Sequence, residues 1–401
     1  MQNCKRMDIF NFHNLIAPLT IEDFFHRYWE KSFVHNIHNN PNYFDQILTI
    51  ADIDALLSQQ NLIPDGIKMM DKGLNIPSER WTRSDTLLNG TIRTVVEPKK
   101  LFELFHNGHT VIINSAERSI PRLAAACQRM EQQLKFKVQS NIYITPPGSQ
   151  GFALHYDPHD IFLMQIKGPK TWLIYDSGEE LPITYRSFKN EPKLVSKFDI
   201  HSGDFLYIPR GTPHEAYASE SSTIHVNFSL KPVYGFHLIE EIARIAADHE
   251  KFFRQTIPHG FQSEEDQKNY LNEFKEELSE LIAKIKPEQL LEKQKNIFAK
   301  EQLLNFEGRL INSLQLENIT SETIVSRLNG FTTISEYIKN TWVIRFGEQK
   351  VKIPAFVEKD IFMQDEPFRI NQIKGLITDQ GRLEIVRRLI EAGFLKIDQL
   401  K

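Results

Sequence analysis

Three residues in the middle of the chain have the types and spacing of a metal-binding set. His155 and Asp157 lie two positions apart in HYDPHD, and His214 follows in PRGTPHE. On a β-strand, His155 and Asp157 would point to the same side, because side chains alternate along a strand. Two histidines and one carboxylate on one face of an ion are typical of non-haem Fe(II) centres. The alternative is a hydrogen-bonded pair at a strand end and an unrelated turn histidine.

A lysine in an apolar strand predicts an anionic ligand beside this set. Lys170 follows the turn Gly168-Pro169 and alternates with Trp172 and Ile174, so we expect it on an apolar face. A buried ammonium group requires an anionic partner. A dicarboxylate whose other end chelates the metal would supply one. The alternative is a strand-end lysine whose charged group reaches solvent.

Further polar residues are candidates for the same pocket. Asn141 and Tyr143 alternate on the preceding strand, where they could donate hydrogen bonds to the same ligand. Asn227 alternates with a histidine on the last predicted strand, so one face of that strand is a candidate to reach the site. A core or surface role is the better interpretation for His159, His201 and His225. The loops add weaker pocket-facing candidates: Ser149, Gln150, Asp160 and Arg210.

The elements that must position these residues are mostly short strands. From about residue 92, apolar runs alternate with turn residues: TIRTVVE, TVIINS, NIYITPP, IFLMQI, TWLIYD, FDIHSGDFLYIP and STIHVNFSL. One helix, SIPRLAAACQRMEQQLKF, interrupts them. This pattern predicts a β-sandwich or barrel rather than an α/β sheet. Before it, Thr20 and Thr49 each precede an acidic residue by three positions, which indicates two helix N-termini.

After Pro232 the pattern becomes helical. FHLIEEIARIAADHEKFF and SEEDQKNYLNEFKEELSELIAKIK repeat apolar residues at helical spacing. Surface helices packed on the barrel and a helical dimerisation module both fit this pattern. From about residue 333 we expect a small α+β unit. Its predicted elements are a helix (TTISEYIKNT), two strands (WVIRFG and QKVKIPAFV), a helix (DQGRLEIVRRLIEAG) and a short last strand.

Composition places the chain among ordinary globular proteins. It has 401 residues, 41% of them apolar and 25% charged, with a net charge of −4, so we expect two or three domains. Its two cysteines, Cys4 and Cys127, form no CxxC pair, which argues against a disulfide framework or a cysteine-ligated zinc and suits a reducing cytosol. No signal peptide or transmembrane run is apparent, so we expect a cytoplasmic protein.

Two segments together resemble a known family. NIYITPPGSQGFALHYDPHDIFLMQIKGPKTWLIYDS and GDFLYIPRGTPHEAYAS closely resemble the JmjC-type cupin oxygenases, specifically the ribosomal-oxygenase branch. The resemblance implies an α+β chain built on a double-stranded β-helix (cupin/JmjC) barrel. The implied domains are an N-terminal helical/strand entry (1–90), the catalytic barrel (91–232), a helical dimerisation domain (233–332) and a winged-helix-like domain (333–401).

The resemblance also implies a chemistry. It assigns His155, Asp157 and His214 to Fe(II), and Lys170 to the distal carboxylate of the co-substrate 2-oxoglutarate. Asn141 and Tyr143 would line that pocket, and Asn227 is grouped with them. With O2, such proteins hydroxylate an amino-acid side chain in a protein or peptide; a ribosomal protein is the first expectation. Related halogenases lack the carboxylate, so Asp157 favours hydroxylation. A homodimer is implied as well.

Three other functions remain open from sequence alone. The substrate could be a biosynthetic, ribosomally made peptide. The chain could be a winged-helix DNA-binding regulator with a cupin sensor, or an inactive binding scaffold. Residues 335–401 hold twelve Lys and Arg against ten Asp and Glu, a net of +2. Because DNA affinity needs several phosphate contacts, a nucleic-acid partner is not expected.

Overall fold

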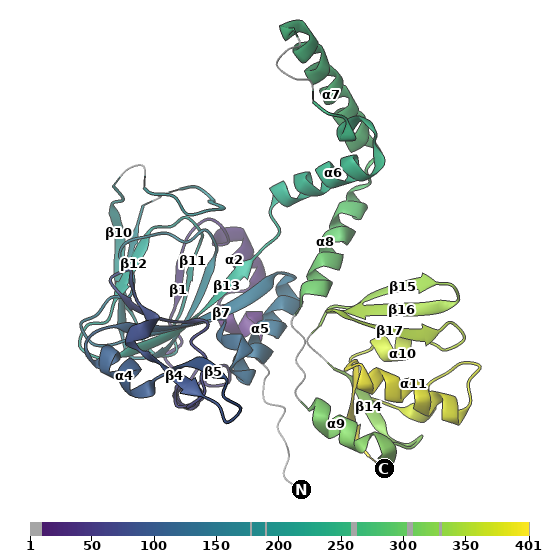
Figure 1. Cartoon of the computed structure of the whole chain (residues 1–401), viewed down its shortest axis with the longest axis horizontal. Helices are drawn as coiled ribbons and strands as arrows, with labels where there is room; N and C mark the ends of the chain where they lie inside the picture. The colour runs from purple at the N-terminus through teal and green to yellow at the C-terminus, as the bar shows by residue number, and fades with distance from the viewer. Residues whose placement is uncertain are drawn as a thin grey trace. The chain divides into compact units, whose positions relative to one another are not determined.

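The computed structural model describes residues 10–176, 179–188, 191–257, 263–302, 308–328 and 331–400. These residues divide into two compact units, one ending at Lys231 and the other beginning at Pro232 (Figure 1). None of the described helices is long and apolar enough to span a membrane. Cys4 lies outside the described residues, and Cys127 is a buried free thiol.

An eight-stranded antiparallel sheet forms the centre of the first unit, in the order β1-β11-β8-β13-β7-β6-β2-β3. The strands are β1 Val34–Asn36, β2 Ile67–Asp71, β3 Leu74–Ile76, β6 Thr110–Asn114, β7 Lys137–Thr145, β8 Ile161–Lys167, β11 Phe205–Ile208 and β13 Thr223–Lys231. β13 pairs with β7 on one side and β8 on the other. Eight of its nine residues are buried, so it is a strand covered on both faces.

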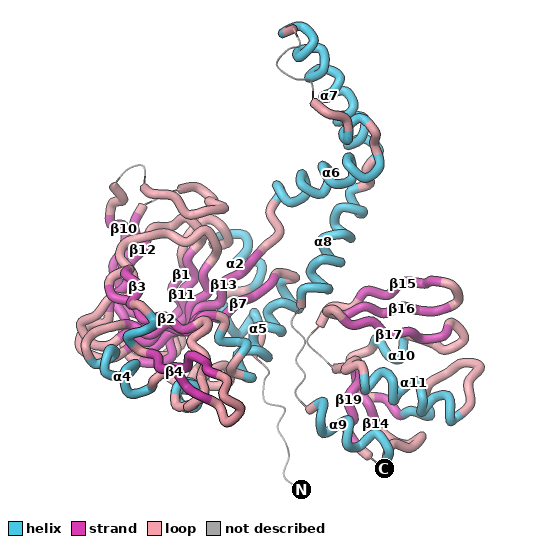
Figure 2. The backbone as a smooth tube through the Cα atoms, in the orientation of Figure 1, coloured by secondary structure: helices cyan, strands magenta, loops and turns pink. Residues whose placement is uncertain are grey.

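A second, three-stranded sheet has the order β10-β9-β12. Its strands are β9 Lys170–Tyr175, β10 Leu194–Ile200 and β12 His214–Tyr217, and a separate hairpin joins β4 Thr82–Thr86 to β5 Ile92–Val96. The two sheets confirm the predicted cupin-type β-sandwich in a chain of mixed α and β content (Figure 2). The predicted turn between β8 and β9 is present, and Gly168 (φ +70°) is required there because a Cβ would lie 2.4 Å from the Ser222 carbonyl oxygen.

Five helices accompany these sheets: α1 Phe12–Ile16, α2 Ile21–Arg27, α3 Ile50–Leu57, α4 Pro98–His106 and α5 Pro121–Leu134. The predicted N-caps Thr20 and Thr49 each accept a hydrogen bond from the backbone N–H three residues on. The sequence did not indicate β1, β2 and β3, which add the N-terminal region to the main sheet. These strands have only three to five residues, too few for alternation to stand out.

The second unit starts with the predicted helices and ends in two small sheets. Its helices are α6 Gly235–His249, α7 Glu264–Lys284, α8 Pro287–Glu301, α9 Arg309–Gln315, α10 Asp360–Met363 and α11 Asp379–Glu391. The sheets are β18-β14-β19 (Phe368–Arg369, Ile324–Arg327, Leu395–Gln399) and β15-β16-β17 (Ile334–Ile338, Thr341–Phe346, Gln349–Pro354). β16, β17, α11 and β19 confirm the sequence prediction.

The helix predicted over TTISEYIKNT is wrong, because this segment contains strand β15 and the hairpin turn to β16. Lys339 and Asn340 both adopt positive φ angles, of 47° and 59°. Two such residues form the tight turn that matches the twist of paired strands. In ISEYI the residues Ile334, Glu336 and Ile338 therefore share one face of a strand.

Candidate metal centre

His155, Asp157 and His214 come together as the sequence predicted. Their potential ligand atoms lie within 4.8 Å of one another, and no other cluster of three such residues occurs in the part of the chain that the structure describes. Nε2 of His214 is 3.8 Å from Oδ2 of Asp157. His214 is buried at the start of β12, whereas the other two side chains are half-buried.

The expected strand position of His155 and Asp157 is wrong. Both lie in the connection between β7 and β8, and His155 forms only an isolated β-bridge with His214. Three backbone hydrogen bonds hold this connection to the turn before β12. The His155 N–H donates to the His214 carbonyl (3.1 Å), the His214 N–H to the His155 carbonyl (2.7 Å), and the Gly211 N–H to the Asp157 carbonyl (2.9 Å). Backbone bonding therefore sets the spacing of all three ligands.

Both histidine rings are oriented by a second hydrogen bond. Nδ1 of His155 lies 2.8 Å from the Ala153 carbonyl oxygen, and Nδ1 of His214 lies 2.9 Å from the Thr212 carbonyl oxygen. A carbonyl can only accept, so each Nδ1 carries the proton and each Nε2 keeps a free lone pair for a metal. Burial, together with nearby His155, lowers the pKa of His214 to about 4. His214 is thus neutral at pH 7, as a metal ligand must be.

A cavity of about 130 Å³ adjoins the cluster. Its walls come from β6, β7, the β7–β8 connection, β9, β12 and β13. The lining residues are Thr110, Tyr143, Thr145, Gly151, Phe152, His155, Asp157, Lys170, Trp172, His214, Ala216, His225 and Asn227. The cavity therefore connects the metal ligands with the buried lysine, as the sequence predicted.

Lys170 is 5% exposed, and no carboxylate among the described residues is paired with it. Its Nζ donates to Thr145 Oγ1 at 3.3 Å and lies 3.5 Å from His225 Nδ1. Burial lowers the pKa of Lys170 to about 7. A buried ammonium group without a counter-ion is costly, so this end of the cavity favours an anion.

Three buried polar atoms on the cavity-lining residues have no hydrogen-bond partner: Thr110 Oγ1, Trp172 Nε1 and Asn227 Oδ1. Buried polar groups are usually satisfied, so each unpaired atom needs an explanation. The Trp172 indole N–H can only donate, and the centroid of its ring is 5.7 Å from that of His214 and 6.0 Å from that of His225. A ligand with acceptor atoms along the cavity would satisfy it.

The other predicted pocket residues divide into two groups. Tyr143 and Asn227 line the cavity, and burial raises the pKa of Tyr143, so its hydroxyl stays protonated. Asn141 does not line it; its Oδ1 accepts from the Ser115 N–H at 3.1 Å and from Gln139. None of the four loop candidates lines it either: Ser149, Gln150, Asp160 and Arg210.

His225 is the residue that the sequence interpretation undervalued. It is buried, lines the cavity, and stacks on Tyr143 with ring centroids 4.7 Å apart. Burial and the Lys170 charge keep its pKa well below the usual value, so the ring is neutral. The only available signal was its alternation with Asn227 on the last strand.

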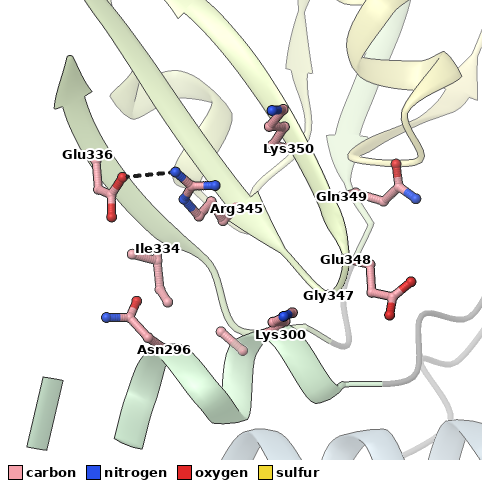
Figure 3. A pocket seen from close by; sticks show the side chains of 10 residues that line it. Asn296, Lys300, Ile334, Glu336, Arg345, Gly347, Glu348, Gln349 and Lys350 are labelled. Carbon is pink, nitrogen blue, oxygen red and sulfur yellow. Dashed lines mark hydrogen bonds and ion pairs between the residues drawn. The ribbon is translucent and has the colours of Figure 1, made fainter. Parts of the chain in front are cut away.

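A larger cavity, of about 450 Å³, lies in the second unit between α8 and the β15-β16-β17 sheet (Figure 3). Arg345 and Glu336 form an ion pair there at 3.3 Å, and Lys300, Glu348 and Lys350 are exposed at its rim. The lining carries three cationic and two anionic side chains, and no metal-ligand cluster of the described residues is present. Size alone therefore does not identify the reactive site.

Residues 113–236 match the JmjC domain family. The match agrees with the two-sheet fold and the His-Asp-His cluster, and it makes this region a JmjC-type cupin domain. The match confirms the resemblance to JmjC-type oxygenases that was recognised in the sequence.

Several similar sequences are named bifunctional lysine-specific demethylase and histidyl-hydroxylase NO66. The Drosophila mojavensis protein is 29% identical over 223 residues, which cover 54% of this chain and 24% of that protein. The Caenorhabditis elegans protein is 26% identical over 318 residues, covering 72% of this chain and 41% of that protein. The chain thus spans less than half the length of these relatives.

Two solved structures of Escherichia coli YcfD share the fold. One X-ray structure has a TM-score of 0.55 at 16% identity, covering 95% of this chain and 98% of that chain. The other is described as a ribosomal oxygenase in complex with cobalt and 2-oxoglutarate. It has a TM-score of 0.53 at 16% identity, covering 95% and 99% of the two chains.

Proposed function

We propose that this chain is an Fe(II)- and 2-oxoglutarate-dependent dioxygenase that hydroxylates an amino-acid side chain in a protein or peptide. One observation carries the proposal: a facial set of two histidines and a carboxylate opens into a cavity that ends at a buried lysine without a counter-ion. A metal-chelating dicarboxylate satisfies both ends of this cavity at once.

The donor set fits these groups. The nitrogen and oxygen donors of His155, Asp157 and His214 suit non-haem Fe(II), with its remaining coordination positions available to co-substrate and oxygen. Lys170 and Thr145 would hold the distal carboxylate of 2-oxoglutarate. The Trp172 N–H, which has no partner, fits one of its acceptor oxygens.

The bound metal and co-substrate supply oxygen activation; the protein supplies position and protection. The hydrogen bonds from Nδ1 keep both ligand rings in place with Nε2 available. The aromatic walls formed by Tyr143, Phe152 and Trp172 limit the access of water to the reacting centre. Tyr143 and Asn227 offer further polar contacts within the same cavity, and Asn141 supports β7 from outside it.

A ribosomal protein is our first proposal for the substrate. The names of the similar proteins, histidyl-hydroxylase and ribosomal oxygenase, support a protein as the target. A ribosomally made biosynthetic peptide presents the same chemistry and is the second candidate.

We also propose that the helical part of the second unit mediates homodimerisation. Apolar side chains remain exposed along α7 and α8: Leu271 (56%), Ile282 (50%) and Leu291 (56%). An apolar stripe of this kind is typical of a helix that has a partner. The remainder, with α11 beside the β18-β14-β19 sheet, is proposed as a winged-helix-like domain.

The direct test is optical. Fe(II) and then 2-oxoglutarate are added to the purified chain without oxygen, and the visible spectrum is recorded. A charge-transfer band that is absent in Lys170→Ala and His155→Ala would support the proposal. Absence of the band with metal demonstrably bound would overturn it. Mass spectrometry of ribosomal proteins and peptides incubated with the active enzyme would then identify the substrate.

A further inference from the structure

Arg210 lies in the turn that presents His214, yet its buried side chain does not line the cavity and instead pairs with half-buried Glu30. It is 8% exposed. Its Nε and Nη2 both donate to Oε1 of Glu30, at 3.1 and 2.8 Å. Glu30 is in the segment after α2, 180 residues earlier in the sequence. An ion pair thus connects the N-terminal region to the turn before a metal ligand.

The same guanidinium group also binds the connection between β9 and β10. Its Nη1 donates to the carbonyl oxygens of Pro182 (3.2 Å) and Leu181 (3.4 Å). The neighbouring Gly211 shows how closely this connection lies against the turn. A Cβ on Gly211 would be 2.1 Å from the Glu179 carbonyl oxygen and 2.7 Å from Pro182 Cδ. Arg210 therefore joins three chain segments that are distant in sequence.

Glu30 makes a second connection, to the segment that carries the other two ligands. Its N–H donates to the hydroxyl of Tyr207 at 2.9 Å, and that hydroxyl donates to Oδ1 of buried Asp160 at 2.5 Å. Asp160 follows Asp157 by three residues. From the other side, the Gly211 N–H holds the Asp157 carbonyl. Glu30 thus contacts the turn before His214 through its carboxylate and the segment after Asp157 through its backbone N–H.

We propose that Arg210 is a positioning residue for the metal centre, which it stabilises by pairing with Glu30 and binding the Leu181 and Pro182 carbonyls. Without Arg210 the turn from Pro209 to Pro213 loses its buried support. His214 and the Asp157 carbonyl are then free to separate. This inference rests on the metal centre proposed above and adds a residue that touches neither metal nor co-substrate. Outer contacts of this kind typically change metal affinity by about 10- to 100-fold.

The test measures metal affinity and folding separately in the 401-residue chain. Co(II) alone is the probe, titrated by its visible absorption, and thermal unfolding is recorded without metal. The variants are Arg210→Gln, Arg210→Lys, Glu30→Gln and the double variant Arg210→Gln/Glu30→Gln. Arg93→Gln is the matched control, because Arg93 also pairs in a fork with one carboxylate, Asp85, in the β4–β5 hairpin.

Arg210→Gln should raise the Co(II) Kd by about 10- to 100-fold, and Arg93→Gln should leave it unchanged. Arg210→Lys should recover part of the affinity, because it keeps the charge but cannot reach both Glu30 and the carbonyls. The double variant should be no weaker than the weaker single variant, as expected for two partners in one contact.

Wild-type Co(II) affinity in folded Arg210→Gln or Glu30→Gln would overturn the inference, as would an equal loss in Arg93→Gln. If Arg210→Gln does not fold, Arg210→Lys and Glu30→Gln decide the question by the same measurements. If the wild-type chain does not bind Co(II), the metal centre itself is wrong, and this inference falls with it.

Discussion

The ammonium nitrogen of Lys170 lies 3.5 Å from Nδ1 of His225, and both side chains are buried. The protonation state of each group therefore affects that of the other. Burial lowers the pKa of both groups, and the Lys170 charge lowers that of His225 further. A neutral imidazole is a weak partner for a buried ammonium group. A carboxylate bound in the cavity would therefore supply the negative charge that Lys170 lacks among the described residues.

Co-substrate binding should depend on pH through Lys170. Burial lowers the pKa of Lys170 to about 7, so above this pH binding of a carboxylate requires uptake of a proton. The Kd for 2-oxoglutarate should then rise by about tenfold per pH unit. Anaerobic titration of the charge-transfer band between pH 6 and pH 9 measures it. The Lys170→Arg side chain stays protonated over this range, so the Kd of this variant for 2-oxoglutarate should not change with pH. A flat wild-type profile would contradict this account.

Lys170 should also make folding depend on pH, but stability should rise with pH whereas 2-oxoglutarate binding weakens. The pKa of Lys170 is lowered from 10.5 in the unfolded chain to about 7 in the folded one. Between these values the unfolded chain binds one more proton, so the contribution of Lys170 to stability improves as pH rises. Lys170→Met should therefore raise the Tm at pH 6 more than at pH 9. Equal shifts at both pH values would show that the buried charge is not responsible.

The indole N–H of Trp172 should contribute directly to 2-oxoglutarate binding. This donor is buried without a partner on a cavity-lining side chain. Trp172→Phe removes the N–H and keeps an aromatic ring. A hydrogen bond to a charged acceptor is worth about 1.5–3 kcal/mol, so the Kd for 2-oxoglutarate should rise at least tenfold. Metal affinity should not change. Trp81→Phe is the control, because its Nε1 already donates to the Ile76 carbonyl.

The reactive residues were predictable where their chemical type is itself informative. A lysine beside Trp172 and a histidine after Pro209–Pro213 are unusual on their own, so their positions could be interpreted without the fold. Asn141 shows the limit. Alternation placed it on one face with Tyr143, but its side chain accepts a hydrogen bond from the Ser115 N–H instead of lining the cavity.

Residues that reach the site through tertiary packing carried no signal. Thr110 comes from β6, and nothing in its surroundings in the sequence separates it from a core threonine. Glu30 is more remote still, since its contact with Arg210 depends on how β1 pairs with β11. The hairpin turn at Lys339 and Asn340 was missed because neither is glycine, the residue most often found at positive φ.

The negative charge of Asp157 should be required for metal binding. Asp157→Asn keeps the size of the side chain but removes the anionic ligand, so Fe(II) or Co(II) affinity should fall below detection at micromolar concentrations. Asp160→Asn is the comparison. It lies three residues on, outside the cavity, and the amide oxygen can still accept from Tyr207. Calorimetric titration with Co(II) distinguishes the two variants; similar affinities would remove Asp157 from the ligand set.

The N-terminal helices should be needed for the stability of the unit that holds the site. Phe24 is fully buried against Phe12, Phe162 and Tyr207, whereas its neighbour Phe25 is 36% exposed. Phe24→Ala should destabilise the first unit by about 3–5 kcal/mol, and Phe25→Ala by clearly less. Because the chain has two units, Co(II) release during denaturant unfolding is the readout that reports on the first. Equal midpoints for the two variants would mean that α2 folds independently of the sheet that it covers.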